Sequence, residues 1–540
     1  MLLRTGQAAT VGALGFSFNL RAAQLLQSKS PKGVVIGEEN GAKVGEKILA
    51  EGGNAIDAAV ATALMSCVAT PSRCGLGGYG GHMTIALKGG KKVTSIDFNT
   101  MAPAAARADM YPLDEKGQVK GRANFFGWLA VGVPGTPAGL QLALERYGTR
   151  SFRELVQPAI EAAENGIVVT DFFQRAIRSA LPRFRNDPGS SKVYLKDGQL
   201  PPVGERLRYP DLAKLLSTLA ERNSVDSFYR GDIAQRLADE FKKNGGLVTA
   251  KDLAKYHARE VEPLNLKWNE FSIFTAPLTA GGLTVLEALS LLKTVRSEFM
   301  KDPLRIAHAR LEAIRLAWKD RLTELGDPEK VKVPVEHLLS SQYIHGLASK
   351  VDSAVKTKRP LEIHVQKHTD EGTNNISCAD AHGNMVAVTL TQGGGFGAQV
   401  MADGLGVTLG HGMSRFDPHP EHPNAPGPGK RPLHNMCPSV VLRGGKPLLA
   451  LGGAGGVRIP NAIYDVLWHY VGRNATMEDA IAAPRLNCTG TFDVTVEREW
   501  PKESADYLTE IGFKVQTGEG ARVSAVIHEP KTGECRAAMR

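Results

Sequence analysis

The sequence contains no C-x-x-C pair, no dense run of basic residues and no internal repeat across its 540 residues. Its six cysteines are widely spaced, so neither a zinc ribbon, a redox pair nor a disulfide framework is indicated, and we expect buried thiols. The net charge of +9 comes from Lys and Arg scattered among acidic residues, which predicts a solvated surface and no nucleic-acid partner. Because 42% of the residues are hydrophobic, the chain can bury a large core, which excludes disordered and fibrous classes.

The N-terminal segment has the layout of an export signal. Residues 1–30 combine a basic start, a short and weakly apolar middle and an alanine-containing end. This layout predicts a periplasmic or extracytoplasmic protein, and the alternative is a cytoplasmic protein with a disordered N-terminus. The apolar run is too short to cross a bilayer, so we expect no membrane-spanning segment in the mature protein.

The periodicity of apolar residues predicts an α+β protein. Residues 41–70 indicate two helices joined by a tight turn at Gly52-Gly53-Asn54, and residues 150–350 are mostly helical in pattern. From residue 374 onward, short β-branched runs separated by Gly, Pro and Asn predict strands. The G-x-G-x-x-G pattern at residues 75–80 follows a helix and precedes a strand, which is the reverse of the order that dinucleotide binding requires.

A hairpin near residue 380 brings two threonines together. Apolar residues alternate with smaller or polar ones on both sides of residues 381–384, which is typical of a β-hairpin. A two-residue turn at His382-Gly383 would place Thr373 opposite Gln392, with Thr391 beside it. A register shifted by two would still leave Thr391 near the start of the first strand. We therefore expect two threonine hydroxyls to meet at one strand end, although a plain structural hairpin would have the same pattern.

A threonine hydroxyl becomes a useful nucleophile when a free α-amine takes its proton, and that requires the threonine to be the first residue of its chain. For Thr373 this means cleavage of the bond to Gly372, whose lack of a side chain leaves its carbonyl open to attack. Farther along, residues 446–471 indicate a strand, a glycine turn and a helix. Backbone N–H groups of Gly455 and Gly456 at this helix start could hold an oxyanion.

A family resemblance extends these expectations over nearly the whole chain. The chain contains, in order, GGNAIDAAVATAL, GLGGYGG, DFNTMAPAAA, VGVPGTPAGLQLALERYGT, GTNNISCADAHGNMVAVTLT, GKRPLHNMCPSVV and LGGAGGVRI. These blocks resemble those of γ-glutamyltranspeptidases, which are Ntn (N-terminal-nucleophile) hydrolases. The resemblance implies a four-layer αββα sandwich, Thr373 as autoprocessing nucleophile, Thr391 in contact with it, and Gly455-Gly456 as the oxyanion hole. It also implies a large chain of residues 31–372 and a small chain of residues 373–540 that remain together as a heterodimer without a cofactor.

Several substrate-contacting positions of the family carry other residues here. Asn99 replaces an arginine, His434 and Asn435 replace two serines, Gly393 replaces an asparagine, and Arg415 replaces an acid. The candidate substrate-binding residues are Asn99, Gln392, Arg415, His434 and Asn435. Because Arg415 would repel an α-ammonium group, glutathione-like γ-glutamyl amides compete with a small acidic amide that lacks the amine, such as oxamate or an acyl-β-lactam side chain.

Two further readings of the sequence concern a metal site and a protein without turnover. His411, His419, His422 and His434 have spacings that fit no metal motif, so we expect no metal. The remaining alternative from another functional class is an uncleaved homologue that binds a ligand or a partner without turnover.

Overall fold

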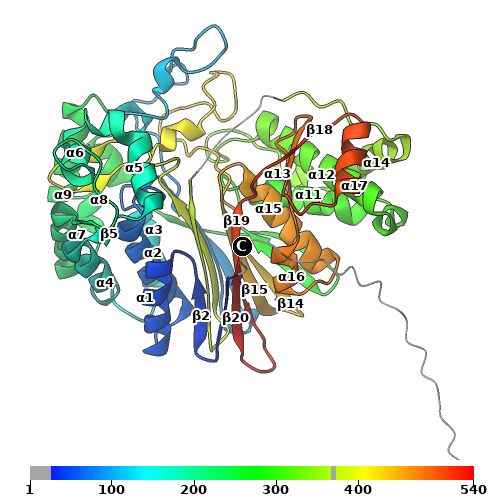
Figure 1. The fold of residues 1–540 in the computed structure, drawn as a ribbon, viewed down its shortest axis with the longest axis horizontal. Coiled ribbons are helices and arrows are strands. Elements are labelled where there is room, and N and C mark those ends of the chain that lie inside the picture. Colours follow the sequence, from blue (N-terminus) through cyan, green and yellow to red (C-terminus); the bar gives the residue numbers. More distant parts are fainter. Residues whose placement is uncertain (1–25, 366–371) are drawn as a thin grey trace, which may run out of the picture.

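The computed structural model describes residues 26–365 and 372–540. Two β-sheets stack face to face in the centre of the molecule, and a layer of helices covers the outer face of each (Figure 1). The expected α+β architecture, a four-layer αββα sandwich, is confirmed. Residues 1–25, which contain most of the predicted export signal, lie outside the described part of the chain.

The first sheet has six strands and contains the predicted hairpin. In spatial order it comprises β2 (Gly33–Ile36), β10 (Asn374–Asp380), β11 (Met385–Thr391), β3 (Gly80–Ala86), β4 (Val93–Asp97) and β7 (Arg259–Val261). The two hairpin strands β10 and β11 are buried throughout, because one face packs on helices and the other on the second sheet. Apolar residues such as Ile376 and Val388 face the helices, whereas smaller residues such as Ala379 and Ala387 allow the sheets to approach.

The second sheet has seven strands. In spatial order it comprises β1 (Leu26–Ser30), β20 (Cys535–Met539), β19 (Arg522–His528), β15 (Lys446–Ala454), β14 (Ser439–Arg443), β9 (Phe271–Thr275) and β8 (Leu264–Trp268). Strand β1 uses the last five residues of the segment assigned to an export signal. A signal cleavage that preserved this strand would therefore fall before Leu26.

The helices divide between the two outer faces. The six-stranded sheet is covered by helices of the first half of the chain: α1 (Glu39–Ala50), α2 (Ala55–Ala69), α3 (Thr136–Tyr147), α4 (Phe152–Asn165), α5 (Asp171–Phe184), α6 (Pro188–Tyr194), α7 (Pro210–Arg222), α8 (Asp226–Tyr229), α9 (Asp232–Lys243) and α10 (Ala250–Lys255). The seven-stranded sheet is covered by α11 (Gly282–Thr294), α12 (Pro303–Glu324), α13 (Val335–Leu338), α14 (Ser341–Thr357), α15 (Arg458–Leu467), α16 (Met477–Ala482) and α17 (Lys502–Glu510). Small strands complete the fold: β5 (Ile167–Val168), β6 (Arg206–Leu207), β12 (Met401–Ala402), β13 (Val407–Thr408), β16 (Leu486–Asn487), β17 (Asp493–Val496) and β18 (Lys514–Thr517).

Helix α2 fixes the position of the hairpin. It begins where the sequence predicts, at Asn54, whose side chain forms a reciprocal capping box with Asp57. Every residue of α2 is buried, and the helix packs against β10 and β11. At its start, the backbone N–H of Ala55 donates to the Asp380 carboxylate, so the helix dipole and a charged cap join α2 to the hairpin loop.

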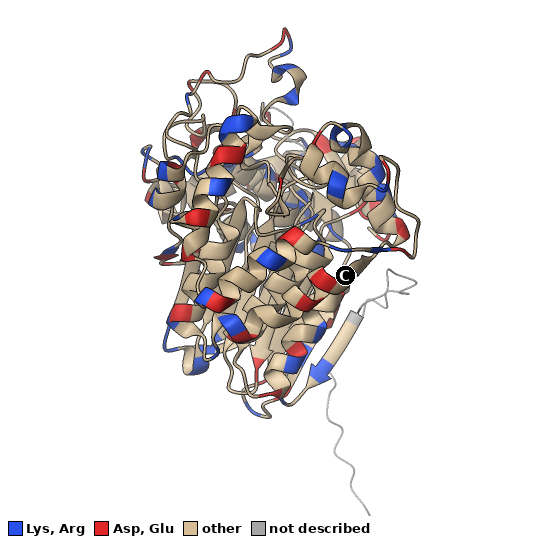
Figure 2. Cartoon of the chain, turned by 90° about the vertical axis from the view of Figure 1, so that its left-hand side faces the viewer, with Lys and Arg blue, Asp and Glu red and all other residues tan. Residues whose placement is uncertain are grey.

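The outer surface carries charges of both signs. On the face formed by the helices at the left of Figure 1, Lys and Arg alternate with Asp and Glu over the exposed turns (Figure 2). In the described residues, no helix is both long and apolar enough to cross a membrane.

The segments on the two sides of Gly372 share both sheets. Strand β10 pairs with β2 and β11 pairs with β3 in the first sheet. In the second sheet, β20 pairs with β1 and β14 pairs with β9. Neither segment therefore has a complete sheet of its own.

Candidate active site

Thr373 lies directly before β10, at one end of the space between the two sheets. Arg522, the first residue of β19, and Ala454, the last residue of β15, line the same space. The residue is only 5% exposed, and its hydroxyl donates to the carbonyl oxygen of Gly372. It lines a cleft of about 690 Å³, together with Gly372, Ala454 and Gly455. The threonine hydroxyl is thus placed between a peptide carbonyl and an open cleft.

The hairpin register differs from the expected one by one residue. Asn374 pairs with Leu390 and Ala379 with Met385, so continuing the ladder sets Thr373 opposite Thr391. The predicted two-residue turn, with Thr373 opposite Gln392, was wrong. Asp380 causes the difference, because its carboxylate accepts from the backbone N–H groups of residues 382 and 384 and so stabilises a three-residue loop.

The turn after β11 holds Thr391 in place. Its fully buried hydroxyl oxygen accepts from Gly393 N at 2.8 Å. The next amide, Gly394 N, donates to His411 Nε2 at 2.6 Å, and His411 Nδ1 lies 2.6 Å from Ser414 Oγ. Burial, reinforced by the charge of Arg415, lowers the pKa of His411 to about 3, so the imidazole is neutral and Nε2 can accept.

Beneath Thr373, a polar contact crosses the space between the sheets. The buried Asn375 amide lies 2.6 Å from Thr389 Oγ1 on the neighbouring strand and 2.6 Å from Ser524 Oγ on β19. A side chain on Gly452 of β15 would collide with this amide. Asn375 therefore locks the two sheets together two residues from the nucleophile candidate.

Gly455 and Gly456 connect β15 to α15, as the strand, turn and helix pattern predicts. Both have positive φ angles, +147° and +62°, which explains the two glycines. The Gly455 carbonyl accepts from the backbone and Nε of Arg458, at 3.3 Å and 3.2 Å. Gly455 lines the same cleft as Thr373.

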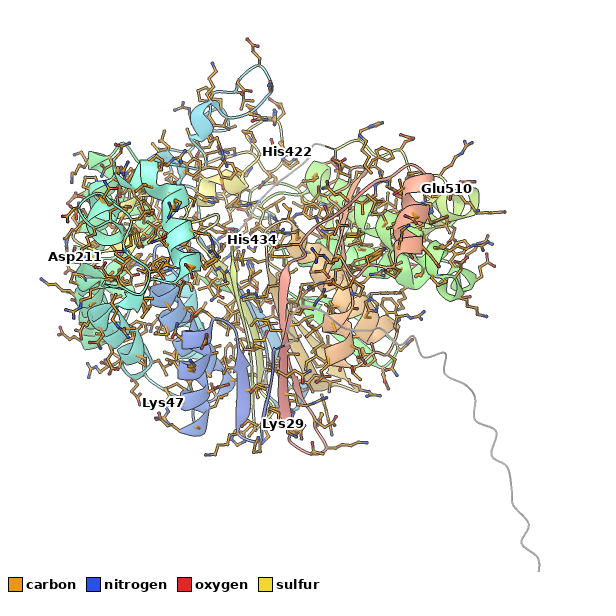
Figure 3. All side chains as sticks on the ribbon, in the orientation of Figure 1. Lys29, Lys47, Asp211, His422, His434 and Glu510 are labelled. Atoms are coloured by element: carbon orange, nitrogen blue, oxygen red, sulfur yellow. The ribbon has the colours of Figure 1, made fainter. Side chains whose placement is uncertain are left out.

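Two predicted substrate residues, Asn99 and His434, meet at Thr279. Asn99 Nδ2 donates to Thr279 Oγ1 at 2.8 Å, and His434 N donates to the Thr279 carbonyl at 3.0 Å. His434 Nε2 lies 2.9 Å from His82 Nδ1, and His82 Nε2 lies 3.4 Å from Asp97. Burial lowers the pKa of His82 to about 4 and that of His434 well below its usual value. Figure 3 shows His434 at the upper end of the sheets, between the two helical layers.

The other three predicted residues are spread around this region. Arg321 donates to the Asn435 side chain at 3.4 Å, and the nearby charge of Arg415 adds to burial in lowering the pKa of Arg321 to about 10. Gln392 is turned toward the helical layer, where its amide packs over Gly75. Within the described part of the chain, the lining of the Thr373 cleft includes none of the five predicted substrate residues.

Sequence reasoning missed several residues that line or support the cleft. Arg73, Arg458 and Arg522 line it, and Asn375 and His411 support it from behind. The GGVRI block contains Arg458 next to the two glycines, so only that one had a local signal.

Of the four histidines considered for a metal site, His419 and His422 share Asp417 as a partner, at 2.7 Å and 3.9 Å. His422 Nε2 also lies 2.7 Å from the Leu322 carbonyl, whereas His411 and His434 have the contacts given above. Across residues 26–365 and 372–540, no group of three His, Cys, Asp or Glu side chains could hold a metal ion.

Comparisons with known proteins agree with this architecture. The family profile described as gamma-glutamyltranspeptidase matches residues 41–540. The chain is 35% identical over 489 residues to a glutathione hydrolase proenzyme of Pseudomonas sp. (strain A14), covering 87% of this chain and 84% of that protein. It is 33% identical over 478 residues to the Acylase ACY 1 proenzyme of Pseudomonas sp. (strain V22), covering 87% and 85%. The crystal structure of a cephalosporin acylase from Bacillus halodurans superposes with a TM-score of 0.84 at 28% identity, covering 98% and 97%.

A four-layer αββα sandwich with a threonine at the start of a central strand defines the class of Ntn hydrolases, and this chain is an enzyme of that class. Within the class, the chain belongs to the γ-glutamyltranspeptidase family.

Proposed function

We propose that the protein is a self-processing amide hydrolase in which Thr373 first cuts the Gly372–Thr373 bond and then attacks a small-molecule amide. The observation that carries the proposal is the contact between the Thr373 hydroxyl and the Gly372 carbonyl at the edge of a cleft. The names of two relatives, a glutathione hydrolase proenzyme and an acylase proenzyme, support it. The products would be residues up to 372 and residues 373–540, held together by shared sheets.

The proposed chemistry uses the same hydroxyl twice. In processing, Thr373 Oγ1 attacks the Gly372 carbonyl carbon, the C–N bond breaks to form an ester, and water hydrolyses that ester to leave a free α-amine. In turnover, the amine takes the hydroxyl proton, the substrate acyl group moves to Oγ1, and the leaving amine departs with the proton. Water then releases the acid. Thr391 positions the nucleophile, and the N–H groups of Gly455 and Gly456 stabilise the oxyanion.

For the substrate, we propose a γ-glutamyl-type amide such as glutathione, with a small acidic amide as the second candidate. The small acidic amide is favoured by the residues found at the positions that bind a glutamyl group in the family. The Asn99 amide donates to Thr279 and, at 2.6 Å, to the Pro432 carbonyl, and Arg415 stands at the sequence position where the family has an acid that binds the ammonium group. Similarity to a cephalosporin acylase favours the same alternative. The export layout of residues 1–30 supports a periplasmic or extracytoplasmic location.

A denaturing gel with N-terminal sequencing tests the proposal. The wild-type protein should give two fragments, the smaller beginning at Thr373, and Thr373→Ala should remain one chain without amidase activity. Thr323→Ala, at an exposed threonine of α12, is the matched control and should be processed normally. A single wild-type chain that behaves like Thr373→Ala would refute the proposal. Assays with a γ-glutamyl anilide, oxamate and a glutaryl amide then rank the substrates.

A further inference from the structure

The cleft beside Thr373 contains more arginines than carboxylates. Its arginines are Arg73, Arg458, Arg485, Arg498, Arg522 and Arg540, and its acidic residues are Glu497, Glu499 and Glu519. They come from positions 73, 458, 485, 497–499, 519–522 and 540, so no local sequence pattern concentrates this charge.

Two of these arginines have carboxylate partners inside the protein. Glu497 is buried and pairs with Arg485 at 3.0 Å and with Arg540 at 2.8 Å. Glu499 lies 3.6 Å from Arg540. The charges of Arg485 and Arg540 are therefore balanced by carboxylates of the protein.

Three other arginines of the cleft lack such a partner among the described residues. In the described part of the chain, no carboxylate forms an ion pair with Arg73, Arg458 or Arg522. Arg458 donates to two carbonyl oxygens, that of Gly455 at 3.2 Å and that of Glu519 at 3.4 Å, so its guanidinium group lies beside the glycine turn.

Arg73 and Arg522 lie close enough to repel each other. Burial, with the charge of Arg522 as the next cause, lowers the pKa of the half-buried Arg73 guanidinium. Arg522 begins β19 and shares a face with Ser524, which points into the space between the sheets. Both guanidinium groups thus border the cavity that Thr373 enters.

We propose that Arg73, Arg458 and Arg522 form an anion subsite that binds a carboxylate of the substrate next to Thr373. Guanidinium groups bind carboxylates through paired, charge-assisted hydrogen bonds, and like charges gathered at one cleft are relieved when an anion enters. This inference rests on the proposed function and narrows it to amides that carry a carboxylate. In this proposal the substrate carboxylate is bound by residues of the cleft wall, and not by Asn99 or Arg415.

Matched 4-nitroanilides test the subsite. Glutaryl and pentanoyl 4-nitroanilide differ by one distal carboxylate on the acyl side, and pentanoyl-4-aminobenzoate moves the carboxylate to the leaving amine. The wild-type enzyme should prefer one anionic amide over the neutral one, and the preference should weaken with salt.

In Arg522→Gln and Arg73→Gln, the ratio of kcat/KM for that anionic amide to kcat/KM for the neutral one should fall about 10- to 100-fold, mostly through KM. Arg222→Gln, which removes an exposed arginine paired with Asp232 on the helical surface, should keep the wild-type ratio.

Calorimetry with glutarate and pentanoate on the processed protein gives a second readout. Glutarate should bind more tightly than pentanoate, and Arg522→Gln should remove most of the difference. An enzyme that cleaves itself but binds glutarate no more tightly than pentanoate, and hydrolyses the charged and neutral amides equally well, would overturn the subsite and leave the proposed function standing. A protein that neither cleaves itself nor hydrolyses any of the three amides would instead refute the proposed function.

Discussion

The backbone of Gly372 approaches the carbonyl oxygen of Gly393 so closely that a side chain on Gly372 would collide with it. Gly372 also has a φ of +86°, which other residues rarely adopt. Two independent constraints thus require glycine at the residue whose carbonyl faces the Thr373 hydroxyl. Because the Gly393 N–H group donates to the Thr391 hydroxyl, the end of the hairpin is connected through Gly393 to the backbone of Gly372.

We predict that Gly372→Ala slows processing by at least about 100-fold. The collision and the strained backbone together displace the carbonyl from the Thr373 hydroxyl, which should raise the activation free energy by about 3 kcal/mol. Gly198→Ala is the control, since Gly198 also has a positive φ, +72°, but has open space around it. It should lose about 1 kcal/mol of stability and be processed normally. Fragment formation on a time-course gel measures both. Equal processing rates in the two variants would contradict the role of Gly372.

Thr391 provides a second prediction. Thr391→Val keeps the shape of the side chain but removes the acceptor of the Gly393 N–H group, and should slow both processing and amide hydrolysis by roughly 10- to 100-fold. Thr391→Ser restores the hydroxyl and should recover most of the rate. Rates from the gel and from the nitroanilide assay report the effect. A valine variant that keeps the wild-type rates would contradict the role of this hydrogen bond.

The contact between the sheets predicts a stability effect. Gly452→Ala would push a methyl group into the Asn375 amide and should lower the free energy of unfolding by roughly 1–3 kcal/mol. Gly453→Ala is the matched control on the next residue of β15, where the nearest side-chain atom would lie 3.3 Å away. Urea unfolding of unprocessed protein, carrying Thr373→Ala, gives a single-chain comparison. A larger loss for Gly453→Ala would contradict the packing argument.

His411 predicts a pH dependence of stability. Its pKa is lowered to about 3 in the folded protein, against about 6.5 in an unfolded chain, so the unfolded state binds more protons between these values. Stability is therefore lost as pH falls below 6.5. From pH 6.5 to pH 4.5, His411 should account for roughly 2.5 kcal/mol of this loss. His411→Gln cannot titrate, and its unfolding free energy should fall by that much less over the same range. Parallel pH slopes in the two proteins would rule out this contribution.

Local signals in the sequence predicted the elements around the site correctly. The capped start of α2 at Asn54, the hairpin strands β10 and β11, and the glycine turn between β15 and α15 all follow from residues close together in the chain. Strands β8 and β9 were missed inside a region of helical periodicity. Their alternating LNLKW and FSIFT segments, joined at Asn269 with a φ of +54°, carried a strand signal that the neighbouring helices outweighed.

Side-chain direction and long-range contacts could not be read in the same way. The hairpin loop length depended on the Asp380 carboxylate, which a count of turn residues does not include. Gln392 was predicted to bind substrate and directly follows Thr391 in the sequence. Adjacent residues of an extended segment point to opposite faces, however, and Gln392 is turned away from the cleft. Arg73 and Arg522 are far apart in the sequence, and only the folded chain brings both to the same cleft.

The sharing of both sheets by the segments on either side of Gly372 has a kinetic consequence. Before the cut, the chain refolds as one molecule at a rate independent of its concentration. If the Gly372–Thr373 bond is cut as proposed, unfolding releases two polypeptides, and reassembly becomes a bimolecular reaction that slows on dilution. Processing would therefore act as a one-way step: it preserves the folded structure while removing the ability to regain that structure from a single chain.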